Sequence, residues 1–148
     1  MAPIAHTVEI SRRPEEVFDY ITDPSRFTEW QQAVVSANLE GDSPAKQSSR
    51  VKMRRRMGRR EQDITTEITE FDPPRSYAFR DVDGPVRALG KGKIEPLDGG
   101  ARSRFTFEID FEGKGLGKLL LPIVRKQASK ELTTTHADLK QRLEGGAA

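Results

Sequence analysis

Polar and hydrophobic residues alternate along several stretches of the chain, which is the pattern of half-buried β-strands. The alternation predicts a first strand over residues 4–10, and later strands over residues 34–40, 50–57, 60–71, 76–81, 86–95 and 101–111. Because the connections between consecutive strands in this later set are short, we expect them to pair as an antiparallel meander.

Helical spacing replaces this alternation between the first two predicted strands. Pro14 suits the first turn of a short helix, since proline has no N–H to donate there. The helix should end at Asp23, because the residue before a proline is pushed out of helical geometry. Pro24 then opens a second short helix that runs to Trp30.

The end of the chain predicts one long amphipathic helix from Leu116 to about Leu143, broken only near its start by Pro122. Its roughly 28 residues would extend about 42 Å at 1.5 Å per residue. A helix of this length needs a broad surface to lie against, and only the strands can provide one. We therefore expect a curved sheet around the helix, with a cavity between the two.

The apolar faces of the strands indicate what would line this cavity. The last strand places four large residues on one face, namely Phe105, Phe107, Ile109 and Phe111. Tyr77 and Phe79 share a face of an earlier strand. The strand between these two is bare in its middle, at Gly90 and Gly92. These glycines either let the sheet bend or leave room for a ligand, and the two interpretations are compatible with each other.

Few polar side chains are expected inside the cavity. Arg55 lies on the apolar face of its strand, so its guanidinium either reaches water at the strand end or points inward and needs a partner. Ile123, Gln127 and Glu131 belong to a helix stripe that either faces solvent or supplies the cavity with polar groups. Trp30 is expected in the core, where its indole N–H needs an acceptor.

Seven of the eleven residues from 50 to 60 are Arg or Lys, which is a composition that could bind nucleic acid or an anionic membrane. A two-residue type II′ turn at Gly58-Arg59 would instead pair three of the four outward basic residues with acids: Arg56 with Glu61, Arg54 with Asp63, and Arg50 with Glu67. We therefore favour an internally paired, solvated hairpin over a nucleic-acid surface.

The composition is compatible with one domain over residues 1–148, with 145–148 as a frayed tail. The chain has no cysteine, which excludes disulfides, thiol catalysis and cysteine-ligated metals. His6 and His136 lack acidic residues at metal-binding spacing. We expect His6 to be a packing or surface residue, and His136 to lie at the edge of the packed seam of the long helix. We expect no metal, no cofactor, no transmembrane segment and a cytoplasmic location. The net charge of +2 is too small to imply a polyanion partner.

Residues 6–24 followed by Trp30, the turn Phe71-Asp-Pro-Pro74, the strand start at 98–107 and residues 138–144 occur in an order that resembles the START-like (SRPBCC) superfamily. More narrowly, they resemble its bacterial polyketide cyclase/dehydrase-like group. The resemblance implies an α+β helix-grip fold, in which a seven-stranded curved antiparallel sheet wraps around a long C-terminal helix. Two short helices would connect strands 1 and 2. It also implies a deep cavity for hydrophobic small molecules, but no particular reaction.

Three functions are compatible with these features. The first is binding of a hydrophobic or aromatic small molecule, such as a polyketide, lipid or quinone, between sheet and helix. The second is a polyketide aromatase/cyclase or dehydratase that uses the same cavity, with Arg55 stabilising an enolate and Tyr77, Glu131 or His6 moving protons. The third is binding of an anionic surface through the hairpin. The candidate ligand-binding residues are Trp30, Arg55, Tyr77, Phe79, Gly90, Phe105, Phe107, Ile123, Gln127 and Glu131.

Overall fold

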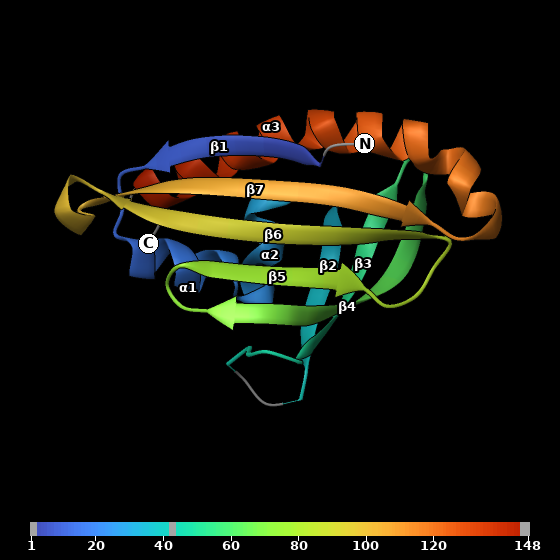
Figure 1. Cartoon of the computed structure of the whole chain (residues 1–148), viewed down its shortest axis with the longest axis horizontal. Coiled ribbons are helices and arrows are strands. Elements are labelled where there is room, and N and C mark those ends of the chain that lie inside the picture. The colour runs from blue at the N-terminus through green and yellow to red at the C-terminus, as the bar shows by residue number, and fades with distance from the viewer. Residues whose placement is uncertain (1–2, 42–43, 146–148) are drawn as a thin grey trace.

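Seven antiparallel strands lie side by side in the order β1-β7-β6-β5-β4-β3-β2 in the computed structural model of the chain (Figure 1). The structure describes residues 3–41 and 44–145. The strands are β1 (Ile4–Ile10), β2 (Val34–Glu40), β3 (Arg50–Met57), β4 (Arg60–Asp72), β5 (Ser76–Asp81), β6 (Val86–Leu97) and β7 (Arg102–Gly113). Each bound lies within two residues of its prediction, and the meander runs from β2 to β7 as expected.

Helices close the sheet at one face and one end. They are α1 (Pro14–Ile21), the 3₁₀ turn η1 (Pro24–Arg26), α2 (Phe27–Trp30), the 3₁₀ turns η2 (Asp98–Gly100) and η3 (Gly115–Leu120), and α3 (Leu121–Glu144). The predicted α+β helix-grip architecture is confirmed. No helix within the described parts of the chain is long and apolar enough to cross a bilayer.

The start of the long helix differs from the prediction. Residues before Leu121 form the 3₁₀ segment η3, and Pro122 lies in the first turn of α3 instead of breaking the helix. Proline is tolerated there because the first helical N–H groups have no partner within the helix. Gly117 is buried in η3 against the backbone of Pro85, where a side chain would collide with the carbonyl group. Of the predicted frayed tail only Gly145 is described, and 146–148 lie outside the described residues.

The hydrophobic core lies at the end of the sheet that α1 covers. Val17, Phe18 and Ile21 of α1 are at most 2% exposed. They belong to a cluster with inward residues of the sheet and the C-terminal half of α3, namely Ile10, Ile94, Phe105, Leu139 and Leu143. Burying a side chain of this size contributes roughly 1.5–3 kcal/mol, so this end of the molecule fixes the fold.

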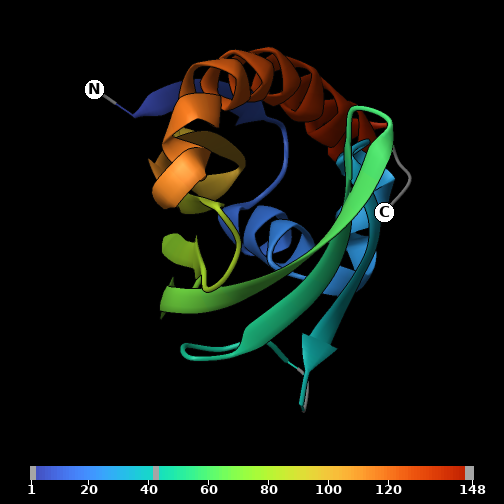
Figure 2. The ribbon, with the colours of Figure 1, turned by 90° about the vertical axis from the view of Figure 1, so that its right-hand side faces the viewer.

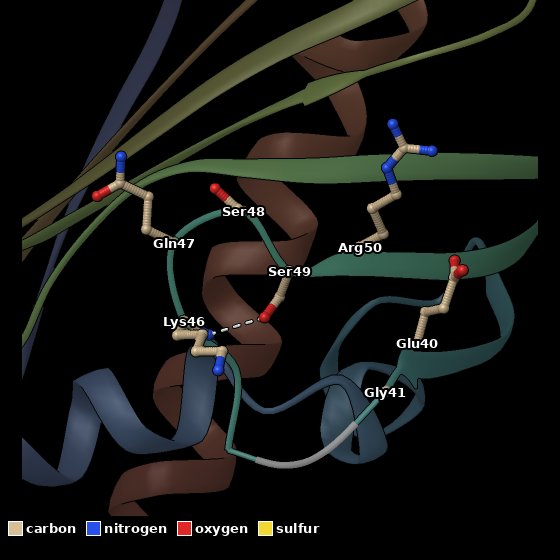
Figure 3. A pocket seen from close by; sticks show the side chains of 7 residues that line it. All are labelled: Glu40, Gly41, Lys46, Gln47, Ser48, Ser49 and Arg50. Carbon is tan, nitrogen blue, oxygen red and sulfur yellow. Dashed lines mark hydrogen bonds between the residues drawn. The ribbon is translucent and has the colours of Figure 1, made fainter.

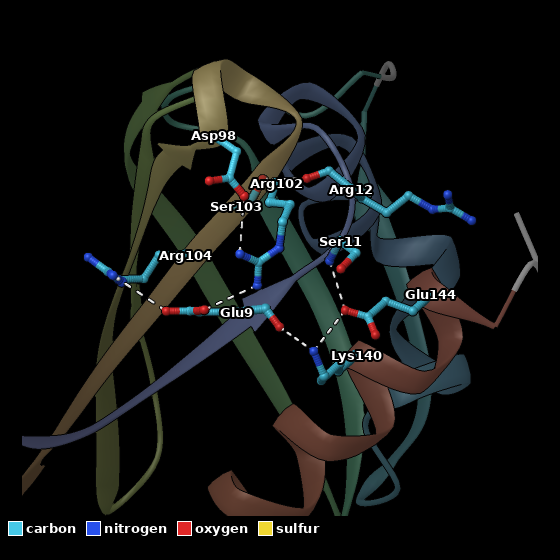
Figure 4. Close-up of polar contacts among 9 residues, drawn as sticks. All are labelled: Glu9, Ser11, Arg12, Asp98, Arg102, Ser103, Arg104, Lys140 and Glu144. Atoms are coloured by element: carbon cyan, nitrogen blue, oxygen red, sulfur yellow. Dashed lines mark hydrogen bonds and ion pairs between the residues drawn. The ribbon is translucent and has the colours of Figure 1, made fainter.

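Polar contacts hold the C-terminal half of α3 onto β1 (Figure 4). The Lys140 ammonium donates a 2.6 Å hydrogen bond to the backbone carbonyl of Glu9 and pairs with Glu144 at 2.8 Å. The backbone N–H of Ser11 donates to the Glu144 carboxylate at 2.7 Å. These bonds fix the register of the helix against the first strand, so the inward stripe of α3 is determined along its whole length.

The β3–β4 hairpin has the predicted register at every pair from Arg50–Glu67 to Met57–Arg60. Gly58 has φ +64, as the first position of a type II′ turn requires. Arg54 pairs with Asp63 at 2.9 Å and with Glu61 at 3.6 Å. Arg50 lies 4.0 Å from Glu67. Glu61 therefore pairs with Arg54 and not with its cross-strand neighbour Arg56. Two of the three expected outward pairs form, and the basic run is neutralised only in part.

Candidate functional site

The interior between the sheet and α3 changes from one end to the other. Near α1 the inward side chains Ile10, Ile94 and Phe105 are buried, and Phe71 and Tyr77 pack against this cluster while partly buried. Toward η3 a larger set of inward side chains is only partly buried, namely Met53, Ile64, Phe79, Phe107, Ile109, Phe111 and Val124. The helix packs mainly on β1, β7 and α2, so it lies closer to one edge of the sheet than to its middle strands. We refer to the region around these seven residues as the open end.

Two aromatic rings cover the glycines of β6. A side chain at Gly90 would overlap the Phe79 ring, and one at Gly92 would overlap the Tyr77 ring. The Phe79 ring also stacks on Phe107, with centroids 6.0 Å apart. The room that the bare strand leaves is thus filled by rings of the chain itself, which corrects the interpretation that the glycines leave space for a ligand.

Tyr77 carries a hydroxyl group with no hydrogen-bond partner within the described parts of the chain. Burial raises the pKa of this phenol above its usual value, because a charged phenolate would be poorly solvated there. Tyr77 therefore stays protonated and can donate a hydrogen bond to a bound molecule.

Arg55 and Glu131, two of the predicted polar residues, form an ion pair. The Arg55 guanidinium lies 3.2 Å from the Glu131 carboxylate, and their side chains are 28% and 33% exposed. Gln127 donates a 3.3 Å hydrogen bond to the other Glu131 oxygen. The pair joins β3 to α3, and Figure 2 shows the β3–β4 hairpin reaching the helix. Arg55 thus has a protein partner at the rim of the open end.

Sequence reasoning missed a buried polar pair beside this cluster. Asp81 accepts hydrogen bonds from the Thr66 hydroxyl at 2.9 Å and from the Ala88 N–H at 3.0 Å. Burial raises the pKa of Asp81, and the nearby charge of Arg55 partly opposes the rise. The signal was present in the alternation, since Asp81 follows Tyr77 and Phe79 on the same face of β5.

Trp30 is 6% exposed, and its indole N–H has no hydrogen-bond partner among the described residues. An unsatisfied buried donor costs about 1–3 kcal/mol, so it commonly marks the place of a water molecule or a ligand oxygen. The expectation that Trp30 lies in the core is confirmed. Phe105 is likewise buried in the core, at 1% exposed, and its role as a ligand contact stays a prediction.

The two histidines form a pair on the wall of the interior. Their Nδ1 atoms lie 2.7 Å apart, and the His136 ring packs against Phe105 with centroids 5.2 Å apart. His136 is 1% exposed, which corrects its expected position at the edge of the seam. It lies on the helix face of Leu132 and Leu139, and that face is turned toward the sheet.

Ile123 is not the ligand contact that was predicted, because its stripe takes the solvent-facing alternative of the two that the sequence left open. It is 69% exposed, and the predicted stripe that contains it faces solvent at its start. The stripe turned toward the sheet is instead that of Leu121, Val124 and Ala128, which are partly buried. Gln127 is exposed but reaches the rim through Glu131. The remaining predicted contacts of the candidate site stay predictions.

Two depressions on the surface lie away from this interior. One follows the β2–β3 connection and is lined by the residues drawn in Figure 3, from Glu40 to Arg50. Within it, the Ser49 hydroxyl accepts a 3.1 Å hydrogen bond from the backbone N–H of Lys46. The other lies on the outer face of β6 and β7, around Leu89 and Glu108. No group of three or more potential metal ligands occurs among residues 3–41 and 44–145.

Comparison with solved structures shows the same fold in proteins of very different sequence. A START superfamily protein from Mycobacterium smegmatis superposes with a TM-score of 0.80 at 16% identity, over 98% of this chain and 99% of that one. The Zhui aromatase/cyclase from Streptomyces sp. R1128 superposes with a TM-score of 0.76 at 14% identity, over 95% of this chain and 94% of that one. The di-domain aromatase/cyclase BexL superposes with a TM-score of 0.77 at 16% identity, over 97% of this chain. The chain covers 47% of BexL, which is about half of its length.

Comparison with curated protein sequences gave no match. A family model described as polyketide cyclase/dehydrase and lipid transport matches residues 1–144. The predicted membership of the polyketide cyclase/dehydrase-like group is confirmed by this match, and the START-like fold is shared with the solved structures. The chain therefore belongs to the polyketide cyclase/dehydrase and lipid transport family.

Proposed function

We propose that this chain is one ligand-binding domain that takes up a hydrophobic or aromatic small molecule at the open end of its interior. The observation that carries the proposal is the set of partly buried apolar side chains that line this end between sheet and helix. Pockets for small molecules are mostly apolar, with a few polar groups that fix the ligand's orientation.

Three polar groups are suited to orient such a ligand. The Arg55–Glu131 pair lies at the rim and offers both a donor and an acceptor. Deeper in the interior, beside the core that α1 covers, Tyr77 carries a protonated hydroxyl group, and Trp30 carries a buried N–H that has no partner among the described residues. These groups favour a ligand with carbonyl or hydroxyl oxygens on an apolar frame, such as a polyketide or a quinone, over a plain hydrocarbon chain.

Intrinsic fluorescence tests the proposal, because Trp30 is the single tryptophan. Titration with aromatic polyketides, quinones and fatty acids should give a saturable change for at least one class. Phe107→Ala should weaken that binding about tenfold, since it removes apolar contact area at the open end. Arg54→Ala, on the outer face of the same hairpin as Arg55, is the matched control. If no class gives a saturable change or a thermal shift, the proposal is wrong.

A second candidate function is catalysis by an aromatase/cyclase or dehydratase. It is favoured by similarity to structures that are themselves named aromatase/cyclases and by the presence of a protonated phenol, Tyr77, and a cationic guanidinium, Arg55, on inward faces of the sheet. Arg55→Ala would then reduce turnover of a polyketide substrate more than it reduces binding, whereas equal losses would assign Arg55 to anchoring. The pairing within the hairpin weakens the nucleic-acid alternative. The cytoplasmic location stays a prediction.

A further inference from the structure

Four of the most exposed large hydrophobic side chains lie together where η3 joins α3. Leu116, Leu119, Leu120 and Ile123 are 83%, 75%, 46% and 69% exposed. Their spacing of three, one and three residues places them along one side of the helical segment. The other large hydrophobic side chains that are exposed in the described parts of the chain, Val35 and Leu89, are only 37% exposed and lie on other elements. We refer to the four residues as the apolar ridge, and a contiguous exposed patch of this kind is typical of an interaction site.

The ridge lies in a segment whose charged residues all have the same sign. Residues 113–130 contain five basic residues and no acidic one. Arg125 is paired with Asp110 at 2.6 Å, and Lys114 lies 4.0 Å from Glu112. The other three lysines of this stretch, Lys118, Lys126 and Lys130, take part in no ion pair within the described parts of the chain. The local excess of positive charge is therefore only partly neutralised, and it lies beside the exposed ridge.

The basic residues continue the line of the ridge along α3. From Ile123, the spacing of three and four residues leads to Lys126 and then to Lys130. Both lysines are exposed. A row of aliphatic side chains followed by ammonium groups on the same side is the pattern of a segment that lies on a membrane, with its apolar part among the acyl chains and its cations at anionic headgroups.

We propose that the apolar ridge docks the protein onto the surface of an anionic lipid membrane. The charge pattern decides between the possible occupants. A second copy would bring the same unpaired lysines together across a two-fold interface, and their repulsion would oppose the contact. Nucleic acid would match the lysines but leave four large aliphatic side chains against phosphates. An anionic bilayer matches both parts of the surface.

Docking at this place would put the open end of the interior near the bilayer. η3 and the start of α3 adjoin the ends of β6 and β7 (Figure 1), where the partly buried inner residues Phe111 and Val124 lie. A hydrophobic ligand could then pass between the bilayer and the interior along an apolar path. Docking itself does not depend on the proposed ligand binding, so failure of one leaves the other testable.

Flotation with lipid vesicles tests the proposal. The protein should float with vesicles of phosphatidylcholine and phosphatidylglycerol at 3:1, should not float with pure phosphatidylcholine, and should be released by high salt. Lys118→Glu with Lys126→Glu should weaken binding at least about tenfold, from the roughly fivefold effect of each basic residue at an anionic surface. Arg56→Glu with Arg59→Glu makes the same change of charge on the hairpin and should leave binding unchanged.

A fluorescent label tests insertion directly, because the chain has no cysteine of its own. Leu119→Cys carrying an environment-sensitive dye should shift to the blue with the anionic vesicles. Leu89→Cys, on the outer face of β6, is the control and should not shift. Leu116→Ser with Leu119→Ser should abolish flotation and keep the thermal unfolding of the parent, because both side chains are already in solvent.

Three results would overturn the proposal. One is the absence of binding to the anionic vesicles by the parent protein. Another is an equal loss of binding in the hairpin variant, which would place the contact on the hairpin. The third is a concentration-dependent dimer in solution that Leu116→Ser with Leu119→Ser dissociates, which would assign the ridge to a second copy of the chain.

Discussion

The paired histidines in the interior predict that the protein loses stability in mild acid. Burial, assisted by the neighbouring His6, lowers the pKa of His136 from 6.5 to about 4. In the unfolded chain the same ring titrates near its ordinary value of roughly 6.5. Between these two pH values the unfolded chain takes up a proton that the folded chain does not. The free energy of unfolding therefore falls as the pH falls through this range, and the loss is complete below about pH 4.

The size of the effect follows from the two pKa values. The difference between 6.5 and about 4 corresponds to about 3 kcal/mol in total, at roughly 1.4 kcal/mol per pKa unit. Between pH 7 and pH 4.5 the loss should be about 2 kcal/mol. Small domains have unfolding free energies of only about 5–15 kcal/mol, so a single buried ring should remove a measurable share of the total.

Urea unfolding at several pH values between 7 and 4.5, on the parent and on His136→Gln, measures this effect. Glutamine keeps a polar group beside His6 but does not titrate. It should cost about 1 kcal/mol at pH 7 and reduce the acid-induced loss by about 2 kcal/mol. Comparing the two proteins removes the contribution of Glu9, Asp63 and Glu144, whose pKa values are also lowered. An identical pH dependence in both proteins would refute the reasoning.

Three further substitutions test the packing and the polar contacts. Gly92→Ala should destabilise the folded protein by about 1–3 kcal/mol, because the new methyl group would displace the Tyr77 ring. An unchanged thermal unfolding temperature would show instead that this ring moves aside freely. Ser103→Ala should cost about 1–2 kcal/mol, since the fully buried hydroxyl donates a 2.7 Å bond to the carbonyl of Arg12; a neutral result in urea unfolding would contradict this. Glu131→Gln should change stability by less than about 1 kcal/mol because the pair is partly exposed, while ligand affinity should change by a larger factor.

The sequence predicted the sheet well because the alternation of polar and apolar residues within each strand shows which side chains face inward. Alternation placed the strand bounds within two residues, and the two-residue turn at Gly58-Arg59 fixed the register of the hairpin. The boundary between the 3₁₀ segment η3 and the helix α3 was harder to predict. Glycines at 115 and 117 favour a tight 3₁₀ turn against Pro85, and this contact between distant segments leaves no periodic signal.

The candidate site was predictable only in part. The facing of β3 placed Arg55 inward, but the sequence could not show that Glu131 would reach it from α3. Ile123 was misplaced because a helix with two partly apolar stripes does not reveal which one faces the sheet. His136 was misplaced for the same reason, as its burial depends on the rotation of α3 that the contacts with β1 determine. Asp81 was missed although its strand indicated an inward position.

The unequal packing of the two ends bears on how such a protein can diversify. The side chains that hold the fold are gathered beneath α1, whereas those at the opposite end contribute less to stability because they are only partly covered. Exchanges at Met53, Ile64 or Val124 should therefore alter ligand preference at little cost to folding. One scaffold can in this way acquire new specificities by successive single substitutions, each passing through a folded intermediate.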